Sequence, residues 1–418
     1  MKYIIQGGRK LEGEIEVSGN KNAIFPCVAA ALLTQDEVIL ENMADLADTQ
    51  VLVQILIYLG VKVDRRKTTL VINSKDLKSY VLPKELMTKL RGSIVLVGAI
   101  LARKNKVNFY HPGGDIIGKR SINTHLEAFK SIGALLKKSD LEYSLRFTEQ
   151  ENISVSIFLQ EASVTACENL ILASVLGKKK VVLKNCPKEP HVEDLCKMLL
   201  QMGASIKGVG TDTLLICGVD KLSGTKFKIG IDYIEVGTYA VASAITGGKI
   251  KIFGLDKSNL DPVLEPLRRF GVKIETHDNY LVVSADKLIS PVKIITNIWP
   301  GFPSDLMSVA IVLATQSKGV TLCHDWMYES RMFFVDKLIS MGAQITLADP
   351  HRSLVYGPSK LKGRVIETPD IRAGMALVLA ALVAKGESTI NQIELIERGY
   401  ENVVGKLTNL GADIKKYV

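Results

Sequence analysis

The chain has 418 residues, a formal net charge of +9 at pH 7 and a hydrophobic content of 47%. Its length exceeds the roughly 250 to 300 residues that one hydrophobic core usually supports, so we expect two domains. The longest apolar run, residues 373–384, is too short to span a bilayer, and the N-terminal residues lack the apolar core of a signal peptide. These features argue against a membrane protein, and we expect a soluble, cytoplasmic one.

The positive charge is compatible with nucleic acid, a membrane surface or small anionic ligands as partners. The basic clusters are short, at residues 65–67 (RRK) and 178–180 (KKK), and no aromatic residues are interleaved with them. We expect both clusters in turns on the solvated surface, which argues against a nucleic-acid partner. The six cysteines show no C-x-x-C spacing, so we expect reduced, buried thiols and no metal site.

Six amphipathic helical patterns follow one another along the chain, and each ends at a glycine and continues as a short strand. An almost wholly apolar helix precedes each of them, and a helix that is apolar on all sides must be buried. Successive glycines lie about 70 residues apart, which predicts one α/β unit used six times, three per domain. The glycines are Gly60, Gly133, Gly203, Gly271, Gly342 and Gly411.

Two polar, glycine-bearing stretches are candidates for the connections between the domains, at residues 18–21 and around 230–232. On this reading the opening strand, residues 3–17, pairs with the C-terminal half of the chain. The first lobe is then discontinuous, with residues 1–20 and 231–418, and the second lobe comprises residues 21–230.

Two loops carry candidate anion-binding groups. In residues 18–23 (SGNKNA), Lys21 adds a positive charge to a helix N-terminus, where anions are favoured. Taken alone, this motif is better explained as a capped helix start with a solvated lysine. Residues 111–120 (HPGGDIIGKR) place three glycines around one carboxylate and two cations, which is typical of a mobile loop that approaches an anion closely. A plain glycine-rich turn is the alternative.

Further charged residues are dispersed near the ends of the apolar helices. For any one of them a surface salt bridge is the simpler explanation. The repeat, however, places equivalent helix ends of the two lobes toward one another, which favours a shared site. The members of this set are Arg91 and residues 302–305, 329–331, 370–372 and 397–400.

Taken together, these motifs resemble those of the UDP-N-acetylglucosamine 1-carboxyvinyltransferase (enolpyruvyl transferase) family over essentially the whole chain. The resemblance implies an α/β fold of two inside-out barrel lobes built from six βαβαββ units, three per lobe. It also implies transfer of the enolpyruvyl group of phosphoenolpyruvate to the 3'-hydroxyl of UDP-N-acetylglucosamine, the first committed step of peptidoglycan synthesis, without metal or organic cofactor. The matching motifs are S-G-N-K-N-A at 18–23, G-G-x-x-I-G-x-R at 113–120, S-V-x-A at 163–166, F-P-[ST]-D at 302–305, E-x-R at 329–331, D-[LI]-R at 370–372 and R-G-Y-E at 398–401.

The resemblance implies catalytic roles for a few charged residues. Asp305 would take the proton of the 3'-hydroxyl, and Asp115, on the mobile loop near 111–121, would protonate the methylene carbon of phosphoenolpyruvate. Because Asp305 is expected at a helix start, we expect its removal to cost little stability. Lys21 and Arg398 complete the expected catalytic set. Arg331 and Arg372 would lie near the carboxylate of phosphoenolpyruvate, and Lys21, Arg120 and Arg398 would hold its phosphate. The full set expected to bind phosphoenolpyruvate is Lys21, Asn22, Arg120, Arg331, Arg372 and Arg398.

The nucleotide-sugar site implied by the resemblance draws on both lobes. Its expected lining is Asn22, Arg91, Arg120, Ser121, Ile122, Asn123, Thr124, Ser163, Val164, Asp305 and Met327.

Three positions depart from the family pattern. Asp115 stands where most members carry cysteine, Thr165 replaces a glycine beside the diphosphate, and Asn123 replaces an aspartate near the uracil. The last two leave open a paralogue that uses another nucleotide sugar. A non-catalytic nucleotide-sugar-binding paralogue would lose charged residues such as Lys21, Asp115 and Asp305, which this chain retains. A 3-phosphoshikimate 1-carboxyvinyltransferase is a further alternative, and the motifs at 18–23 and 113–120 argue against it.

The substitution at Asp115 generates a prediction about fosfomycin, which alkylates the cysteine thiolate in this family. A carboxylate is a much weaker nucleophile toward an epoxide, so we expect the wild-type protein to resist fosfomycin. Asp115→Cys should stay active and become inhibited in a time-dependent way. Mass spectrometry of the peptide 113–119 measures the adduct, and an adduct on the wild-type protein would contradict this expectation.

Overall fold

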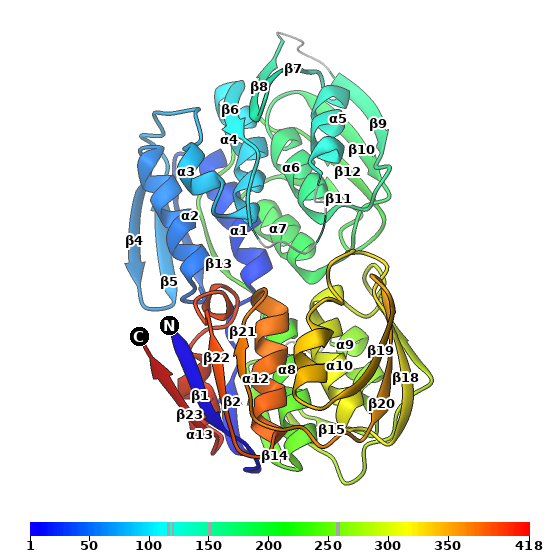
Figure 1. Cartoon of the computed structure of the whole chain (residues 1–418). Helices are drawn as coiled ribbons and strands as arrows, with labels where there is room; N and C mark the ends of the chain where they lie inside the picture. Colours follow the sequence, from blue (N-terminus) through cyan, green and yellow to red (C-terminus); the bar gives the residue numbers. More distant parts are fainter. Residues whose placement is uncertain (115–117, 119–120, 149–152, 256–259) are drawn as a thin grey trace. The chain divides into compact units, whose positions relative to one another are not determined.

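A computed structural model of the chain describes residues 1–114, 118, 121–148, 153–255 and 260–418. The described residues form two compact units (Figure 1). Unit 1 contains Met1–Ser18 and Ile231–Val418, and unit 2 contains Gly19–Gly114 and residues 121–230. Buried apolar side chains form two separate clusters, one in each unit, so each unit has its own hydrophobic core. Among the described residues, no helix is long and apolar enough to cross a membrane.

Unit 1 contains three four-stranded sheets, and each has one parallel and two antiparallel pairs of neighbours. The strands of the first sheet are, in spatial order, β21 (Val365–Glu367), β22 (Glu387–Asn391), β1 (Lys2–Gln6) and β23 (Asp413–Tyr417). Those of the second sheet are β15 (Lys273–Thr276), β16 (Tyr280–Ser284), β14 (Lys249–Phe253) and β2 (Glu12–Glu16). Those of the third sheet are β17 (Lys293–Ile295), β18 (Gly319–His324), β20 (Arg352–Gly357) and β19 (Gln344–Asp349).

Unit 2 follows the same plan with three sheets. In the sheet that has three strands, Val81 forms a parallel bridge to Asn108 and so takes the place of the missing first strand. One sheet contains, in spatial order, β13 (Thr225–Lys228), β3 (Glu37–Glu41), β5 (Thr69–Asn73) and β4 (Lys62–Arg66). The three-stranded sheet contains β6 (Lys106–Tyr110), β8 (Glu142–Phe147) and β7 (Ala134–Ser139). The remaining sheet contains β11 (Ser205–Lys207), β12 (Thr213–Cys217), β10 (Lys179–Lys184) and β9 (Ile153–Phe158).

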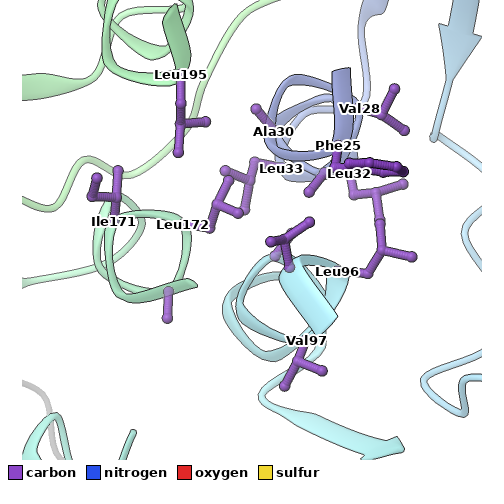
Figure 2. Packing of buried hydrophobic residues seen from close by; sticks show 14 of the residues in the cluster. Phe25, Val28, Ala30, Leu32, Leu33, Leu96, Val97, Ile171, Leu172 and Leu195 are labelled. Carbon is purple, nitrogen blue, oxygen red and sulfur yellow. The ribbon is translucent and has the colours of Figure 1, made fainter. Parts of the chain in front are cut away.

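Three helices are buried at the centre of each unit, and within a unit all three contact one another. Their sequences are apolar around the whole circumference, as in IRAGMALVLAALV of α12, so burial among other helices is the arrangement that removes this surface from water. In unit 2, Figure 2 shows Leu33 and Leu172 pointing toward each other between neighbouring helices. The buried helices are α8 (Tyr233–Thr246), α10 (Met307–Gln316) and α12 (Ile371–Val383) in unit 1, and α1 (Lys21–Ala30), α4 (Leu96–Lys104) and α6 (Val164–Ser174) in unit 2.

The six glycines of the repeat each follow an amphipathic helix, as predicted. All six have φ values between +86° and +103°, in the left-handed region where glycine is favoured. The strand, buried helix, parallel strand, second helix and antiparallel strand pair form a βαβαββ unit, which confirms the predicted fold class. The second helices are α2 (Ala47–Tyr58), α5 (Asn123–Ser131), α7 (Pro190–Gln201), α9 (Asp261–Arg268), α11 (Val335–Ser340) and α13 (Val403–Asn409).

The chain exchanges one strand between two of these repeats. Strand β2 precedes α1 in sequence but pairs in parallel with β14 of unit 1. Strand β13 precedes α8 but pairs in parallel with β3 of unit 2. Next to these strands, Asp232 N donates to Ser18 O (2.9 Å) in unit 1, and Asn20 N donates to Gly230 O (2.8 Å) in unit 2.

Two expectations from the sequence need correction. The opening stretch, residues 3–17, is not one strand but two, because Gly7 and Gly8 interrupt it and donate to carbonyls of Gly386 and Leu382. The strands β1 and β2 do pair with the C-terminal half, in two different sheets.

The basic clusters lie largely in the strands β4 and β10 and not in turns, although four of their six side chains are exposed as expected. Lys179 is half-buried, lies 3.8 Å above the Phe147 ring centre and donates to Ala173 O (3.1 Å). Burial lowers the pKa of Lys179 to about 8.

Gly98 of α4 packs tightly against Asn169 of α6, which leads to a prediction about packing. A Cβ at this position would lie 2.3 Å from the backbone oxygen of Asn169, which cannot rotate away. Helix propensity favours alanine over glycine by about 1 kcal/mol, whereas forced overpacking costs about 1 to 3 kcal/mol. We therefore expect Gly98→Ala to destabilise unit 2 in chemical denaturation. Lys104→Ala, on the same helix, is the control and should change stability by less than about 0.5 kcal/mol.

Candidate active site

In unit 1, the carboxylate of Asp305 lies between two buried arginines. Asp305 is in the turn η4 (Ser304–Leu306) that leads directly into α10. Its Oδ1 accepts from Arg331 Nη2 (3.0 Å), and its Oδ2 accepts from Arg372 Nε (3.0 Å) and forms an ion pair with Arg372 Nη2 (2.9 Å). The arginine side chains are only 1% and 6% exposed, whereas that of Asp305 is 31% exposed. Three residues predicted from distant motifs are thus in direct contact.

Both arginines are held as cations by their surroundings. Burial by itself would lower the pKa of each guanidinium, but neighbouring carboxylates, Asp305 first among them, raise it further than burial lowers it. Each guanidinium also lies over a tyrosine ring, with Cζ 5.3 Å from Tyr328 and 5.2 Å from Tyr400. Both guanidinium groups thus carry a positive charge beside the partly exposed Asp305, which favours an anionic ligand.

This arrangement revises the expectation that Asp305 can be removed at little cost. Removing one partner of a buried ion pair leaves an uncompensated charge, which is strongly destabilising. Truncation of Asp305 would leave both Arg331 and Arg372 without their shared carboxylate. An isosteric amide is therefore the better probe of its chemical role.

Asp325 is a residue of this region that the sequence interpretation missed. Its side chain is fully buried at the end of β18, and its carboxylate accepts from Thr296 Oγ1 (3.2 Å), Met327 N (3.0 Å) and Ser304 Oγ. It also lies 3.9 Å from Arg331 Nε. Asp325 thereby fixes the turn that carries Asp305 and the segment that carries Met327 and Arg331. The sequence signal that could have identified Asp325 is its position directly after the strand β18.

In unit 2, Lys21 is the first residue of α1 and is not a solvated lysine. Its Nζ forms an ion pair with Asp48 Oδ2 (2.7 Å), and the two side chains are 9% and 6% exposed. Asn20 caps the helix by accepting from Asn22 N (2.9 Å). The capped helix start is therefore present, but the lysine is buried in an ion pair whose acidic member, Asp48, the sequence interpretation did not identify.

A second cluster in unit 2 forms where α5 and α6 begin. Arg91 Nη2 donates to Ser121 O (3.0 Å), and Thr124 Oγ1 donates to Glu161 Oε2 (3.2 Å). Helix α6 starts at Val164 after Ser163, whose side chain does not cap it. Helix N-termini and an arginine together favour an anion. Residues predicted from three separate motifs thus surround these two helix starts.

Not every predicted residue contributes a side chain to these clusters. Ile122 is 2% exposed and belongs to the hydrophobic core, so it offers only backbone groups. Arg398 ends η5 (Ile396–Arg398) in unit 1, where the preceding Glu397 accepts from Tyr3 Oη (3.0 Å). Asp115 and Arg120 lie outside the described residues.

His125 is buried directly beneath the second cluster. Its Nε2 lies 3.1 Å from Thr165 Oγ1, and its Nδ1 lies 3.0 Å from Asn169 Nδ2. Burial, reinforced by the nearby charge of Arg91, lowers the pKa of His125 to about 3. Among the described residues, no group of three His, Cys, Asp or Glu side chains is arranged to hold a metal ion.

Comparison with known proteins gives consistent matches over nearly the whole chain. Residues 5–407 match the family model described as EPSP synthase (3-phosphoshikimate 1-carboxyvinyltransferase). A UDP-N-acetylglucosamine 1-carboxyvinyltransferase of Borreliella burgdorferi is 45% identical, over 99% of this chain and 98% of the relative. One of Bradyrhizobium diazoefficiens is 42% identical, over 100% of this chain and 98% of the relative.

Solved structures resemble the chain in fold. The enolpyruvyl transferase NikO from Streptomyces tendae aligns with a TM-score of 0.88 at 23% identity, covering 99% of this chain and 98% of that one. EPSP synthase from Acinetobacter baumannii aligns with a TM-score of 0.77 at 18% identity and covers 100% of both chains. At these identities the likeness concerns the fold alone.

The buried neutral His125 generates a prediction about acid stability. Its folded-state pKa of about 3 lies below the value of about 6.5 expected in the unfolded chain. Between these two values the unfolded state binds a proton that the folded state does not, so stability falls as the pH falls below about 6.5. One such group contributes a slope of about 1.4 kcal/mol per pH unit.

We therefore expect His125→Gln to weaken the pH dependence of unfolding between about pH 4 and 6.5, relative to the wild-type protein. Urea denaturation at several pH values measures the difference. His277→Gln, which replaces an exposed histidine, is the control and should leave the slope unchanged. An unchanged slope in His125→Gln would contradict the assignment.

Proposed function

Because the chain belongs to the UDP-N-acetylglucosamine 1-carboxyvinyltransferase family, we propose that it catalyses the reaction for which that family is named. The enolpyruvyl group of phosphoenolpyruvate is transferred to the 3'-hydroxyl of UDP-N-acetylglucosamine, and phosphate is released. This is the first committed step of peptidoglycan synthesis. The observation that carries the proposal is the 45% identity to a relative of that name over nearly the full length of both chains. The fold alone does not select the substrate, since EPSP synthase shares it.

The arginine pair of unit 1 supports a role for Asp305 as the base. In the structure both oxygens of Asp305 are engaged by Arg331 and Arg372. The carboxylate of phosphoenolpyruvate has the same chemistry as Asp305 and competes for the same donors. Its binding would release an oxygen of Asp305 to accept the proton of the 3'-hydroxyl. Substrate binding and activation of the base are then one event.

The reaction we propose proceeds by addition and elimination. The 3'-oxygen bonds to C2 of phosphoenolpyruvate and transfers its proton to Asp305, while Asp115 donates a proton to C3. In the elimination, the Asp115 carboxylate takes a proton back from C3 as the bond between C2 and the phosphate oxygen breaks, which forms the enol ether. The leaving phosphate accepts the proton held by Asp305, so both carboxyl groups return to their starting states. Lys21, Arg120 and Arg398 neutralise the phosphate as it leaves. Asn22 binds both substrates.

The helix starts of unit 2 support binding of the nucleotide part of the substrate. The contact of Arg91 with Ser121 and the uncapped start of α6 at Val164 provide positive charge and free N–H groups. We assign the diphosphate and uridine to this cluster, with Asn123, Thr124 and Ser163 as further contacts. We also propose that Met327 of unit 1 contacts the nucleotide sugar. We place the reaction in the cytoplasm, which the six free cysteines support.

Release of inorganic phosphate from phosphoenolpyruvate tests the proposed function. Phosphate should appear only when UDP-N-acetylglucosamine is present, and the product should carry the mass of one added enolpyruvyl group. Parallel reactions with other UDP sugars and with 3-phosphoshikimate test the alternatives. Phosphate release with another acceptor, and none with UDP-N-acetylglucosamine, would refute the proposal.

Asp305→Asn isolates the role of the base. The amide preserves the shape of the side chain but accepts a proton poorly, so kcat should fall by about 100- to 10,000-fold. Binding of UDP-N-acetylglucosamine, measured by calorimetry, should remain within a few fold. Asp349→Asn is a matched control, because Asp349 pairs with Arg352 at the surface of unit 1 (2.7 Å). Normal turnover by Asp305→Asn would remove Asp305 from the mechanism.

A further inference from the structure

We propose that the hydroxyl of Thr165 is a directed hydrogen-bond donor to the diphosphate of the nucleotide sugar, oriented by His125 and Asn169. The inference rests on the proposed function in one respect, since it takes the second cluster of unit 2 as the diphosphate site. Thr165 lies in the first turn of α6 and is half-buried. The family resemblance implies a glycine at this position, so a contact from the threonine side chain would be a property of this chain.

The first step is the orientation of Asn169, which backbone groups fix without ambiguity. Its Oδ1 accepts from Gly98 N (2.7 Å), so the oxygen and nitrogen of the amide cannot be interchanged. Its Nδ2 donates to Ile94 O (2.9 Å) and has one proton left for a second acceptor. That second acceptor is His125 Nδ1, at 3.0 Å.

The second step is the tautomer of His125. Nδ1 accepts a hydrogen bond from Asn169, so it carries no proton. The imidazole is therefore neutral, with its single N–H proton on Nε2. The ring is 2% exposed and close to Arg91, and both features disfavour a cation. The Nε2–H group therefore points at Thr165 Oγ1, 3.1 Å away.

The third step is the direction of the Thr165 proton. Its Oγ1 accepts from His125, so its own hydrogen must point elsewhere. Among the described residues, His125 Nε2 is the one hydrogen-bond partner of this hydroxyl, and it acts as a donor. Mid-helix threonines often donate back to a carbonyl one turn earlier, but Thr165 is too close to the start of α6 for such a helical carbonyl. The hydroxyl is left to donate to solvent or to a ligand.

The surroundings of this donor select an anion as the ligand. The first N–H groups of α6 face the same helix end, and Ser163 does not cap them. Arg91 contributes a positive charge that is felt at His125. The hydrogen of the Thr165 hydroxyl is available to a phosphate oxygen, and the positive charge of Arg91 and of the helix start favours an anion over a cation such as an ammonium group. Thr165 would thus add selectivity for a diphosphate.

Calorimetric binding of uridine, UDP and UDP-N-acetylglucosamine tests the proposal with three variants. Thr165→Val keeps the shape and removes the hydroxyl, and it should weaken binding of both diphosphates by about 10-fold or more, as expected for a lost hydrogen bond to a charged group. Binding of uridine should stay the same. Thr165→Ser keeps the hydroxyl and should bind all three within about threefold of wild type. His125→Gln should weaken the binding of UDP and UDP-N-acetylglucosamine and leave the binding of uridine unchanged.

Equal binding of UDP by Thr165→Val and wild type would overturn the proposal, as would a loss that is the same for uridine and UDP. Wild-type protein that fails to bind UDP would overturn it too. The outcome is separable from that of the proposed function. Protein that binds UDP through Thr165 but releases no phosphate with UDP-N-acetylglucosamine would refute the function and leave this assignment standing.

Discussion

The burial of three helices that are apolar on every side is the constraint on which each unit depends. Such helices have no face for water, so the sheets must enclose them, and functional groups can reach the surface only at the helix ends. Several of the candidate site residues, including Lys21, Ser163 and Asp305, lie at or next to those ends. Because the helices recur about every 70 residues, the site is dispersed in sequence. The groups at the six helix starts are Lys21 for α1, Arg91 for the turn before α4, Ser163 for α6, Asp232 for α8, Asp305 for α10 and Asp370 for α12.

Buried charges at these ends come with partners. Lys21 faces Asp48 in unit 2, and Arg331 and Arg372 share Asp305 in unit 1. A buried ion pair contributes little net stability, because desolvation offsets the attraction, but it holds each charge in one place. A site for a highly charged substrate benefits from this, since its cations need not reorganise when the ligand arrives. The partner carboxylates keep the cations in place until then.

The repeat and the fold class could be predicted from the sequence because they depend on local signals. A glycine after an amphipathic helix, such as Gly203, marks a left-handed backbone wherever it occurs. The motifs also led to Asp305, Arg331 and Arg372. Their pairing could not be predicted, because it depends on residues that only the tertiary structure brings together. The same reason explains why Asp325 was missed.

The order of the strands along the chain determines when each sheet can be completed during translation. All strands of unit 2 have been synthesised once β13 is complete, before most of unit 1 is made. Strand β1, by contrast, lies between β22 and β23, which are translated only after all of unit 2 and most of unit 1. Until then the backbone N–H and C=O groups of β1 can bond to water but not to their native partners. The strand therefore joins its sheet late, and in the meantime it presents unpaired edges that favour association with other chains.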